Sequence, residues 1–161
     1  RRAVQERKPP ASLDEVLRNE GSRISFYRYC KNKFAAENIM FWEAIDQYEK
    51  RFTESGVTSR EIQLRARAIV ERFILDGCEK EVNLEYHRRS EIIQAYNRSD
   101  EEGVEPVFDK QTFRAAKGDI FNLMNTNFFA EFMLRNGDLI SSALRRIPAA
   151  DDSDAVHLTV T

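Results

Sequence analysis

The sequence predicts an all-α protein built as one globular domain with a tail at each end. Its 161 residues fit a single domain of ordinary size. Apolar residues recur three and four positions apart, as on one face of a helix, and the glycines and prolines fall between these periodic stretches. We place the domain at residues 12–147 and the tails at 1–11 and 148–161, which show charge and proline but no helical period.

The first two helices are expected at the start of the domain. Ser12 is followed three residues later by Glu15, a capping-box pattern in which the two residues satisfy each other's free backbone N–H groups. That helix ends near Gly21, and a second one begins at Ser22. The residues of the second helix that we expect to face the core are Ile24, Phe26, Tyr27, Cys30 and Phe34.

The stretch 38–52 has the clearest helical pattern in the chain. Its apolar residues lie at offsets 0, 3, 4, 7 and 11, close to the repeat of one buried helix face. These residues are Phe41, Ala44, Ile45, Tyr48 and Phe52. A loop around Gly56 follows, and Thr58 or Ser59 is then expected to cap a helix that Gly77 closes.

The second half of the domain is expected to contain shorter helices. One lies around 86–96, and the acidic run 99–105 after it has too few apolar residues to pack, which indicates an exposed insertion. Further helices are expected over 113–124, 128–134 and 139–147. The pattern predicts about eight or nine helices in all, joined by short connections.

The composition argues against several classes of function. Lys and Arg number 25 against 27 Asp and Glu, so the net charge is −2 and nothing favours nucleic acid as a partner. No apolar run approaches the roughly 18 to 20 residues that cross a bilayer. Cys30 and Cys78 form no paired motif, which indicates a reducing, intracellular setting. Because the chain starts with Arg1 and not with Met, we expect it to be a piece of a longer protein.

The residue types that carry enzyme chemistry are sparse. His87 and His157 are far apart in the sequence, and neither cysteine has a ligand at helical spacing, so we expect no metal site. The same scarcity argues against a Ser-His-Asp or Cys-His pair. Gly77 and Gly118 are isolated and do not form a phosphate-binding loop. We therefore expect no cofactor and no catalytic residue in this chain.

Several stretches, taken together, resemble one known family. Residues 34–44, FAAENIMFWEA, are similar to the signature of the regulator of G-protein signalling (RGS) domain. The stretches that resemble the family's middle and closing sections are 68–74, 81–84, 112–116, 120–124 and 132–133. The resemblance runs from about Ser12 to Asn136 and so covers nearly all of the predicted globule.

The resemblance implies a fold and a function. RGS domains have nine helices, arranged as an antiparallel four-helix bundle and a smaller subdomain formed by the two terminal parts. They bind the GTP-bound α subunit of a heterotrimeric G protein at its switch loops and accelerate GTP hydrolysis without supplying a catalytic residue. On this resemblance we expect a monomeric, cytoplasmic GTPase activator that acts, at least transiently, at the inner face of the plasma membrane.

The resemblance also implies contact residues on three edges between helices. Glu37 and Asn38 match the Glu-Asn pair of the first edge, and Leu123 matches a leucine of the third. The asparagine of the family's second-edge loop falls on Ala95, or on Asn97 if the loop is two residues out of register. From the residues alone, Asn38 can equally be a cap of its helix.

Several contact positions depart from the family pattern. Lys33 stands where many members have an acidic residue. The family's Asp-Ser pair and the following Arg fall on Asn127, Phe128 and Glu131, so a charge-assisted hydrogen bond is weakened and the local charge is inverted. Two functions therefore stay open: a GTPase activator with a diverged contact surface, and an RGS-homology docking or scaffolding module with little or no GTPase-activating activity.

Overall fold

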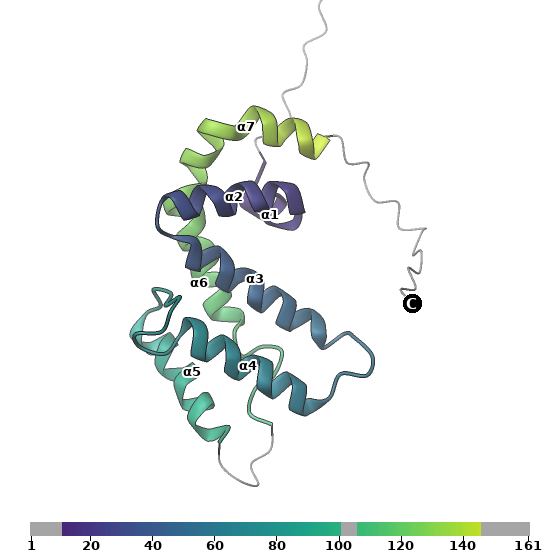
Figure 1. The fold of residues 1–161 in the computed structure, drawn as a ribbon, viewed down its shortest axis with the longest axis vertical. Coiled ribbons are helices and arrows are strands. Elements are labelled where there is room, and N and C mark those ends of the chain that lie inside the picture. The colour runs from purple at the N-terminus through teal and green to yellow at the C-terminus, as the bar shows by residue number, and fades with distance from the viewer. Residues whose placement is uncertain (1–10, 101–105, 146–161) are drawn as a thin grey trace, which may run out of the picture.

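The fold is known from a computed structural model that describes residues 11–100 and 106–145 (Figure 1). Every regular element within these ranges is helical, which confirms the all-α class. The elements are α1 (Leu13–Arg18), α2 (Glu20–Asn32), α3 (Ala36–Arg51), α4 (Ser59–Phe73), α5 (Tyr86–Arg98), α6 (Arg114–Met124), the π-helical segment η1 (Asn125–Phe129) and α7 (Ala130–Arg145). The two expected tails, except for the buried Ala11, and most of the acidic run 99–105 lie outside the described residues.

Polar residues fix the beginnings of α1 and α4 as expected. Glu15 N–H donates to Ser12 Oγ at 3.2 Å, and Ser12 N–H donates to Glu15 Oε2 at 3.1 Å, which completes the capping box. At α4, Thr58 Oγ1 accepts the N–H of Glu61 at 3.2 Å. Both helices therefore begin where their first free N–H groups find a side-chain acceptor.

Two other helix boundaries differ from the expectation. α2 begins at Glu20, two residues early, because Asn19 Oδ1 accepts the N–H of Ser22 at 2.9 Å and so caps the helix. α4 ends at Phe73 and not at Gly77. Gly77 instead lies in the segment between α4 and α5, with a left-handed φ of 74°.

The C-terminal helices are continuous where the sequence predicts separate ones. Residues expected to form helices at 128–134 and 139–147 belong to η1 and to the single helix α7, as far as the structure describes them. Gly137 lies inside α7, where a glycine costs only about 1 kcal/mol relative to alanine and does not end a well-packed helix. The described part of the chain therefore has seven α-helices and one π-helical segment, eight helical elements in all, which agrees with the eight or nine predicted from the pattern and is one fewer than the nine that the family resemblance implies.

The helices form two groups along the long axis of the molecule (Figure 1). α3 packs against α4 and α6, and α4 packs against α5, which gives the expected bundle. α2 packs against α1 and α7, forms the terminal group with them, and also contacts α3. α6 continues through η1 into α7 and so joins the two groups.

No helix in the described ranges is long and apolar enough to span a bilayer.

Aromatic rings connect the helices within each group. Edge-to-face and tilted ring pairs add roughly 0.5–1.5 kcal/mol to the free energy gained from burying their area. The pairs, with the distances between their ring centroids, are Phe41 and Phe73 (5.6 Å), Tyr48 and Phe113 (5.3 Å), and Phe26 and Phe132 (5.1 Å). The face predicted from the spacing in 38–52 is thus the centre of the bundle core.

Two residues that the second predicted helix is expected to bury do not face the core, and Phe52, the last residue of the face predicted over 38–52, is 37% exposed as well. Phe26 and Cys30, four residues apart, are fully buried on one face of α2, whereas Ile24 lies two positions off that face and is 42% exposed. Phe34 follows the end of α2, so the helical period no longer applies to it, and its exposure is 95%. Periodicity alone places both residues wrongly.

The first testable prediction concerns the bundle core. Phe41 has no exposed surface and its ring contacts that of Phe73. Replacing Phe41 by Ala leaves a cavity between α3 and α4 and should lower the free energy of unfolding by about 3–5 kcal/mol. Urea unfolding followed by circular dichroism measures this loss. Leu64→Ala, at a 57% exposed position of α4, is the control; a loss as large there as at Phe41 would contradict this account of the core.

Candidate functional site

Glu37 and Asn38 lie in the first turn of α3, after the turn that joins it to α2. Asn38 is only 4% exposed, and its amide nitrogen donates to Ala35 O at 3.2 Å and to Glu37 Oε1 at 3.3 Å. The residue at the N-cap position is Ala35, which has no capping side chain, so the alternative in which Asn38 caps its helix is wrong. Asn38 instead fixes the entry to α3 and the direction of the half-buried Glu37 side chain.

Two residues that depart from the family pattern contact each other. Lys33 Nζ, at the end of α2, lies 3.0 Å from Glu131 Oε1, at the start of α7. The other carboxylate oxygen of Glu131 accepts the hydroxyl of Tyr29 at 2.8 Å. Arg135, one turn along α7, donates to Glu131 Oε1 at 2.7 Å. We call these four residues the Glu131 cluster; it joins two chain segments 98 positions apart.

The pKa values of the Glu131 cluster reflect these contacts. Hydrogen bonds from Lys33 and Tyr29 to the carboxylate lower the pKa of Glu131, because they favour its charged form. Burial, reinforced by the bond to Glu131, raises the pKa of Tyr29 to about 12. Glu131 is therefore a carboxylate at neutral pH, and Tyr29 remains a hydrogen-bond donor.

The third edge is formed by the end of α6 and by η1. Leu123 is half-buried in the last turn of α6, Asn127 is exposed, and Phe128 is half-buried and packs against the core. Asn127 and Phe128 belong to η1, which widens the helix locally and is of the kind often found at functional sites. The aromatic ring at 128 thus has a packing role, and Asn127 is one of several exposed polar residues that this edge presents.

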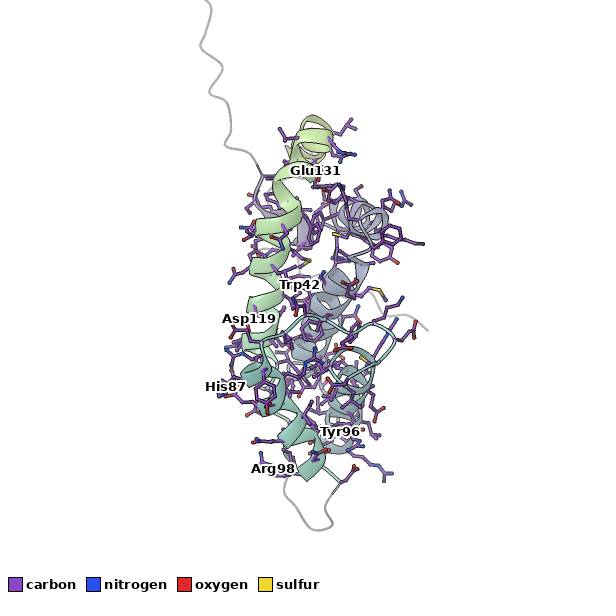
Figure 2. All side chains as sticks on the ribbon, turned by 90° about the vertical axis from the view of Figure 1, so that its left-hand side faces the viewer. Trp42, His87, Tyr96, Arg98, Asp119 and Glu131 are labelled. Atoms are coloured by element: carbon purple, nitrogen blue, oxygen red, sulfur yellow. The ribbon has the colours of Figure 1, made fainter. Side chains whose placement is uncertain are left out.

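The structure does not place Ala95 in a loop. Ala95 lies in the last part of α5 and is 9% exposed, with Ile92 buried one turn before it. Asn97 is exposed, but its neighbours Tyr96 and Arg98 lie at the opposite end of the long axis from Glu131 (Figure 2). Neither residue therefore shares a surface with Lys33 and Glu131. The assignment of the second-edge asparagine to Ala95 is wrong because residues 86–98 form a helix, not the loop it requires.

Asn83 is an exposed asparagine in a loop, and the family resemblance did not lead us to name it as a contact residue. It is exposed between the buried Val82 and Leu84 in the irregular segment that joins α4 to α5. Val82 N–H donates to Phe73 O at 2.9 Å, and the Phe73 ring packs on Phe41, one turn beyond Glu37 and Asn38. The segment is therefore held beside the start of α3. The signal was present in the sequence, since Asn83 belongs to the matched motif 81–84 itself.

Arg89 holds this segment in place. Its side chain is 14% exposed; Nη2 donates to Val82 O at 2.8 Å, and Nη1 donates to Ile74 O. Nη1 also lies 3.1 Å from Glu81 Oε1 and 3.5 Å from Asp76 Oδ1. Carbonyls and carboxylates on both sides of the loop thus share one planar guanidinium, a geometry that a lysine could not reproduce.

The part of the chain that the structure describes contains no group of three His, Cys, Asp or Glu residues arranged to hold a metal ion. His87 is exposed on α5 and pairs with Glu91 at 3.2 Å. His157 lies outside the described residues. The three edges present hydrogen-bonding, charged and apolar side chains.

Comparisons with known proteins agree with this picture. The family model "Regulator of G protein signaling domain" matches residues 12–135. Regulator of G-protein signaling 18 of Homo sapiens is 30% identical over 122 residues, which are 76% of this chain and 46% of the relative. Regulator of G-protein signaling 1 of Xenopus laevis is 28% identical over 76% of this chain and 54% of its own length. Regulator of G-protein signaling 6 of Homo sapiens is 27% identical over 78% of this chain and 23% of its own length. The chain thus spans about half or less of these relatives.

The second testable prediction concerns the pH dependence of stability. A carboxyl whose pKa falls on folding stabilises the folded state above its unfolded-state pKa, which is about 4.3 for glutamate, and that contribution is lost as the pH falls through the folded-state pKa. The pKa of Glu131 is lowered in this way by Lys33 and Tyr29. Glu131→Gln keeps the shape and loses the charge, so it should melt below the wild type at pH 7.

Thermal unfolding between pH 7 and pH 3 measures the difference between the two proteins. We expect the difference in melting temperature to shrink as the pH falls below the unfolded-state pKa of glutamate. It should vanish once Glu131 of the wild type is protonated in both the folded and the unfolded state. Gln94→Ala, at an exposed position of α5 that carries no titratable group, is the control, and its difference in melting temperature from the wild type should not change with pH. A gap between wild type and Glu131→Gln that stays constant over this range would contradict the assigned ionisation.

Proposed function

The chain belongs to the regulator of G-protein signalling domain family, and on this premise we propose that it binds the GTP-bound α subunit of a heterotrimeric G protein and accelerates its GTP hydrolysis. The contact surface consists of the α2–α3 turn with Glu37, the α4–α5 segment with Asn83, and the α6–η1–α7 junction with Leu123 and Asn127. The observation that carries the proposal is that direct contacts hold these three edges in fixed positions.

These contacts give each edge a support. The Glu131 cluster holds the α2–α3 turn against α7. The bond from Val82 to Phe73, together with Arg89, holds the α4–α5 segment beside α3. A surface that is ordered before binding loses little conformational entropy when it forms a complex. Such a surface suits a protein that acts by holding another protein's loops.

The proposed mechanism needs no catalytic group from this chain. Phosphoryl transfer is catalysed mainly by positioning and by charge stabilisation, and both are supplied by the α subunit and its bound Mg²⁺. Binding that favours the transition-state arrangement of the switch loops lowers the barrier, by about 1.4 kcal/mol for each tenfold gain in rate. We assign Asn83 to orient the α subunit's catalytic glutamine, since its exposed amide can both donate and accept a hydrogen bond. Glu37 accepts hydrogen bonds from switch-loop donors, and Leu123 supplies apolar contact.

A second function is favoured by the charges on the surface. Lys33 and Glu131 reverse the signs found in many family members, and Asn127 removes a negative charge. A surface of this kind would serve a docking module that binds an α subunit without stabilising the transition state, since uniform binding does not raise the rate of the chemical step. The two functions predict different kinetics.

The third testable prediction separates them. Single-turnover GTP hydrolysis is measured for a panel of purified α subunits with and without the domain, and affinity is measured for the same subunits with GDP and aluminium fluoride. The proposal predicts acceleration of at least one α subunit and tighter binding of its aluminium fluoride form than of its GDP form. Equal affinity for both forms without acceleration would establish the docking function instead.

Two matched asparagine variants test the assigned second edge. Asn83→Ala should reduce the acceleration at least tenfold, equivalent to about 1.4 kcal/mol of transition-state stabilisation. Asn97→Ala removes the same exposed side chain from the far end of α5, so it should leave the acceleration unchanged. The reverse pattern would show that the asparagine at 97 contacts the α subunit and that our assignment of Asn83 is wrong.

A further inference from the structure

The core residues on the two sides of η1 are spaced unlike those of a regular α-helix. Met124 is the last buried residue of α6 and Phe132 is the first buried residue of α7; neither has any exposed surface. They are eight positions apart, and at 3.6 residues per turn a regular α-helix would leave Phe132 about 80° away from the face that carries Met124. A straight continuation of α6 would therefore turn Phe132 away from the core.

η1 removes this mismatch. Its hydrogen bonds run from residue i to residue i+5, one position further than in an α-helix, so the segment takes up one extra residue within its turn. Met124 and Phe132 are then aligned as if they were seven positions apart, a spacing that drifts by only about 20° in an α-helix. Phe132 accordingly meets the rings of Phe26 and Tyr29, with centroid distances of 5.1 Å and 5.6 Å.

The core does not require the extra residue. A chain one residue shorter would join Met124 to Phe132 by regular α-helix and keep the same alignment. It would also avoid the π-helical conformation, which is rare in proteins. The packing of α7 thus explains why η1 forms, but it does not explain why the chain carries the residue that η1 takes up.

The extra residue changes the surface instead. Asn125, Thr126 and Asn127 are exposed residues in succession, and they make up the first part of η1. Because a π-helical turn is wider than an α-helical one, it carries this polar run outward from the helix axis. Only the buried Met124 separates the run from Leu123, so the run belongs to the third edge of the proposed contact surface.

We propose that η1 is a positioning element of this domain: its extra residue sets how far the third edge projects toward the α subunit, and the acceleration of GTP hydrolysis depends on that projection. This inference rests on the proposed function. A misplacement of about 1 Å can cost about 100-fold in rate where catalysis depends on positioning. One residue in a helical turn is therefore enough to separate productive from unproductive binding.

A purely structural role for η1 predicts a different result. Phe128 and Phe129 end the segment, are half-buried and pack against the core, so in a structural role the wider turn seats these two rings. Closing the turn would then lower the stability of the fold. If η1 serves the surface, closing the turn leaves the stability intact and lowers the acceleration alone.

The fourth testable prediction is a deletion of Thr126, which closes η1 into a regular α-helix. Met124, Phe132 and the Glu131 cluster keep their alignment, so the melting temperature should equal or exceed that of the wild type. Single-turnover acceleration should fall at least tenfold, equivalent to about 1.4 kcal/mol. Affinity for the α subunit with GDP and aluminium fluoride should fall more than affinity for its GDP form. Thr126→Ala removes the side chain but keeps the chain length; as the matched control, it should accelerate hydrolysis within about threefold of the wild type.

The outcomes separate the inference from the function on which it rests. If the wild-type domain accelerates an α subunit and the deletion of Thr126 leaves that acceleration unchanged, the positioning role is refuted and the proposed function survives. If the deletion variant melts lower than the wild type, η1 serves the fold and the inference is refuted. If Thr126→Ala loses as much acceleration as the deletion, the side chain of Thr126 is the active feature and positioning by η1 is refuted. If the wild-type domain accelerates no α subunit, the proposed function fails and the inference fails with it.

Discussion

The carboxylate of Glu131 is the group on which the shape of the candidate surface depends. Three donors, from Lys33 and Tyr29 on α2 and from Arg135 on α7, converge on its two oxygens. α2 and α7 come from opposite ends of the described chain, so this cluster links the two halves of the terminal group. The direction of the α2–α3 turn follows from it, because Lys33 is the last residue before Phe34 and the turn.

The α4–α5 segment and the entry to α3 are held in the same manner, by polar groups that are partly shielded from water. Arg89 binds the carbonyls on both sides of the α4–α5 segment, and Asn38 binds the carbonyl that precedes α3. Isolated surface ion pairs usually contribute little to stability, between about 0 and 1 kcal/mol. These contacts therefore serve mainly to hold the segments in position and contribute little to the stability of the fold. They fix the α2–α3 turn and the α4–α5 segment, whereas the third edge belongs to the continuous helical run from α6 through η1 to α7.

The sequence predicts the parts of this structure that local chemistry decides. The capping box at Ser12, the cap at Thr58 and the buried face with Phe41 and Tyr48 depend on residues within one or two helical turns, so their spacing reveals them. The family match rests on motifs of the same local kind. Phe34 was placed in the core because periodicity does not show where α2 ends.

The remainder of the site depends on contacts between distant segments. Lys33 and Glu131 each stand out in the sequence as a departure from the family, yet no local pattern pairs two residues 98 positions apart. Ala95 was assigned by counting past the motif 81–84, which fails once residues 86–98 are seen to be a helix. Only the fold shows that two opposite charge reversals compensate each other.

A charge-swap cycle at Lys33 and Glu131 tests the central claim, that this pair positions the surface, most directly. The four proteins are the wild type, Lys33→Glu, Glu131→Arg and the double variant, each assayed by single-turnover GTP hydrolysis and by thermal unfolding. We predict that each single variant, which places like charges together, melts lower and accelerates hydrolysis at least threefold less. The double variant should recover part of both properties, because the pair between positions 33 and 131 is restored with its polarity reversed, while Arg135 and the Tyr29 hydroxyl lose their acceptor. A double variant that regains its melting temperature but not its rate would contradict the claim, since the two charges would then act on the partner directly.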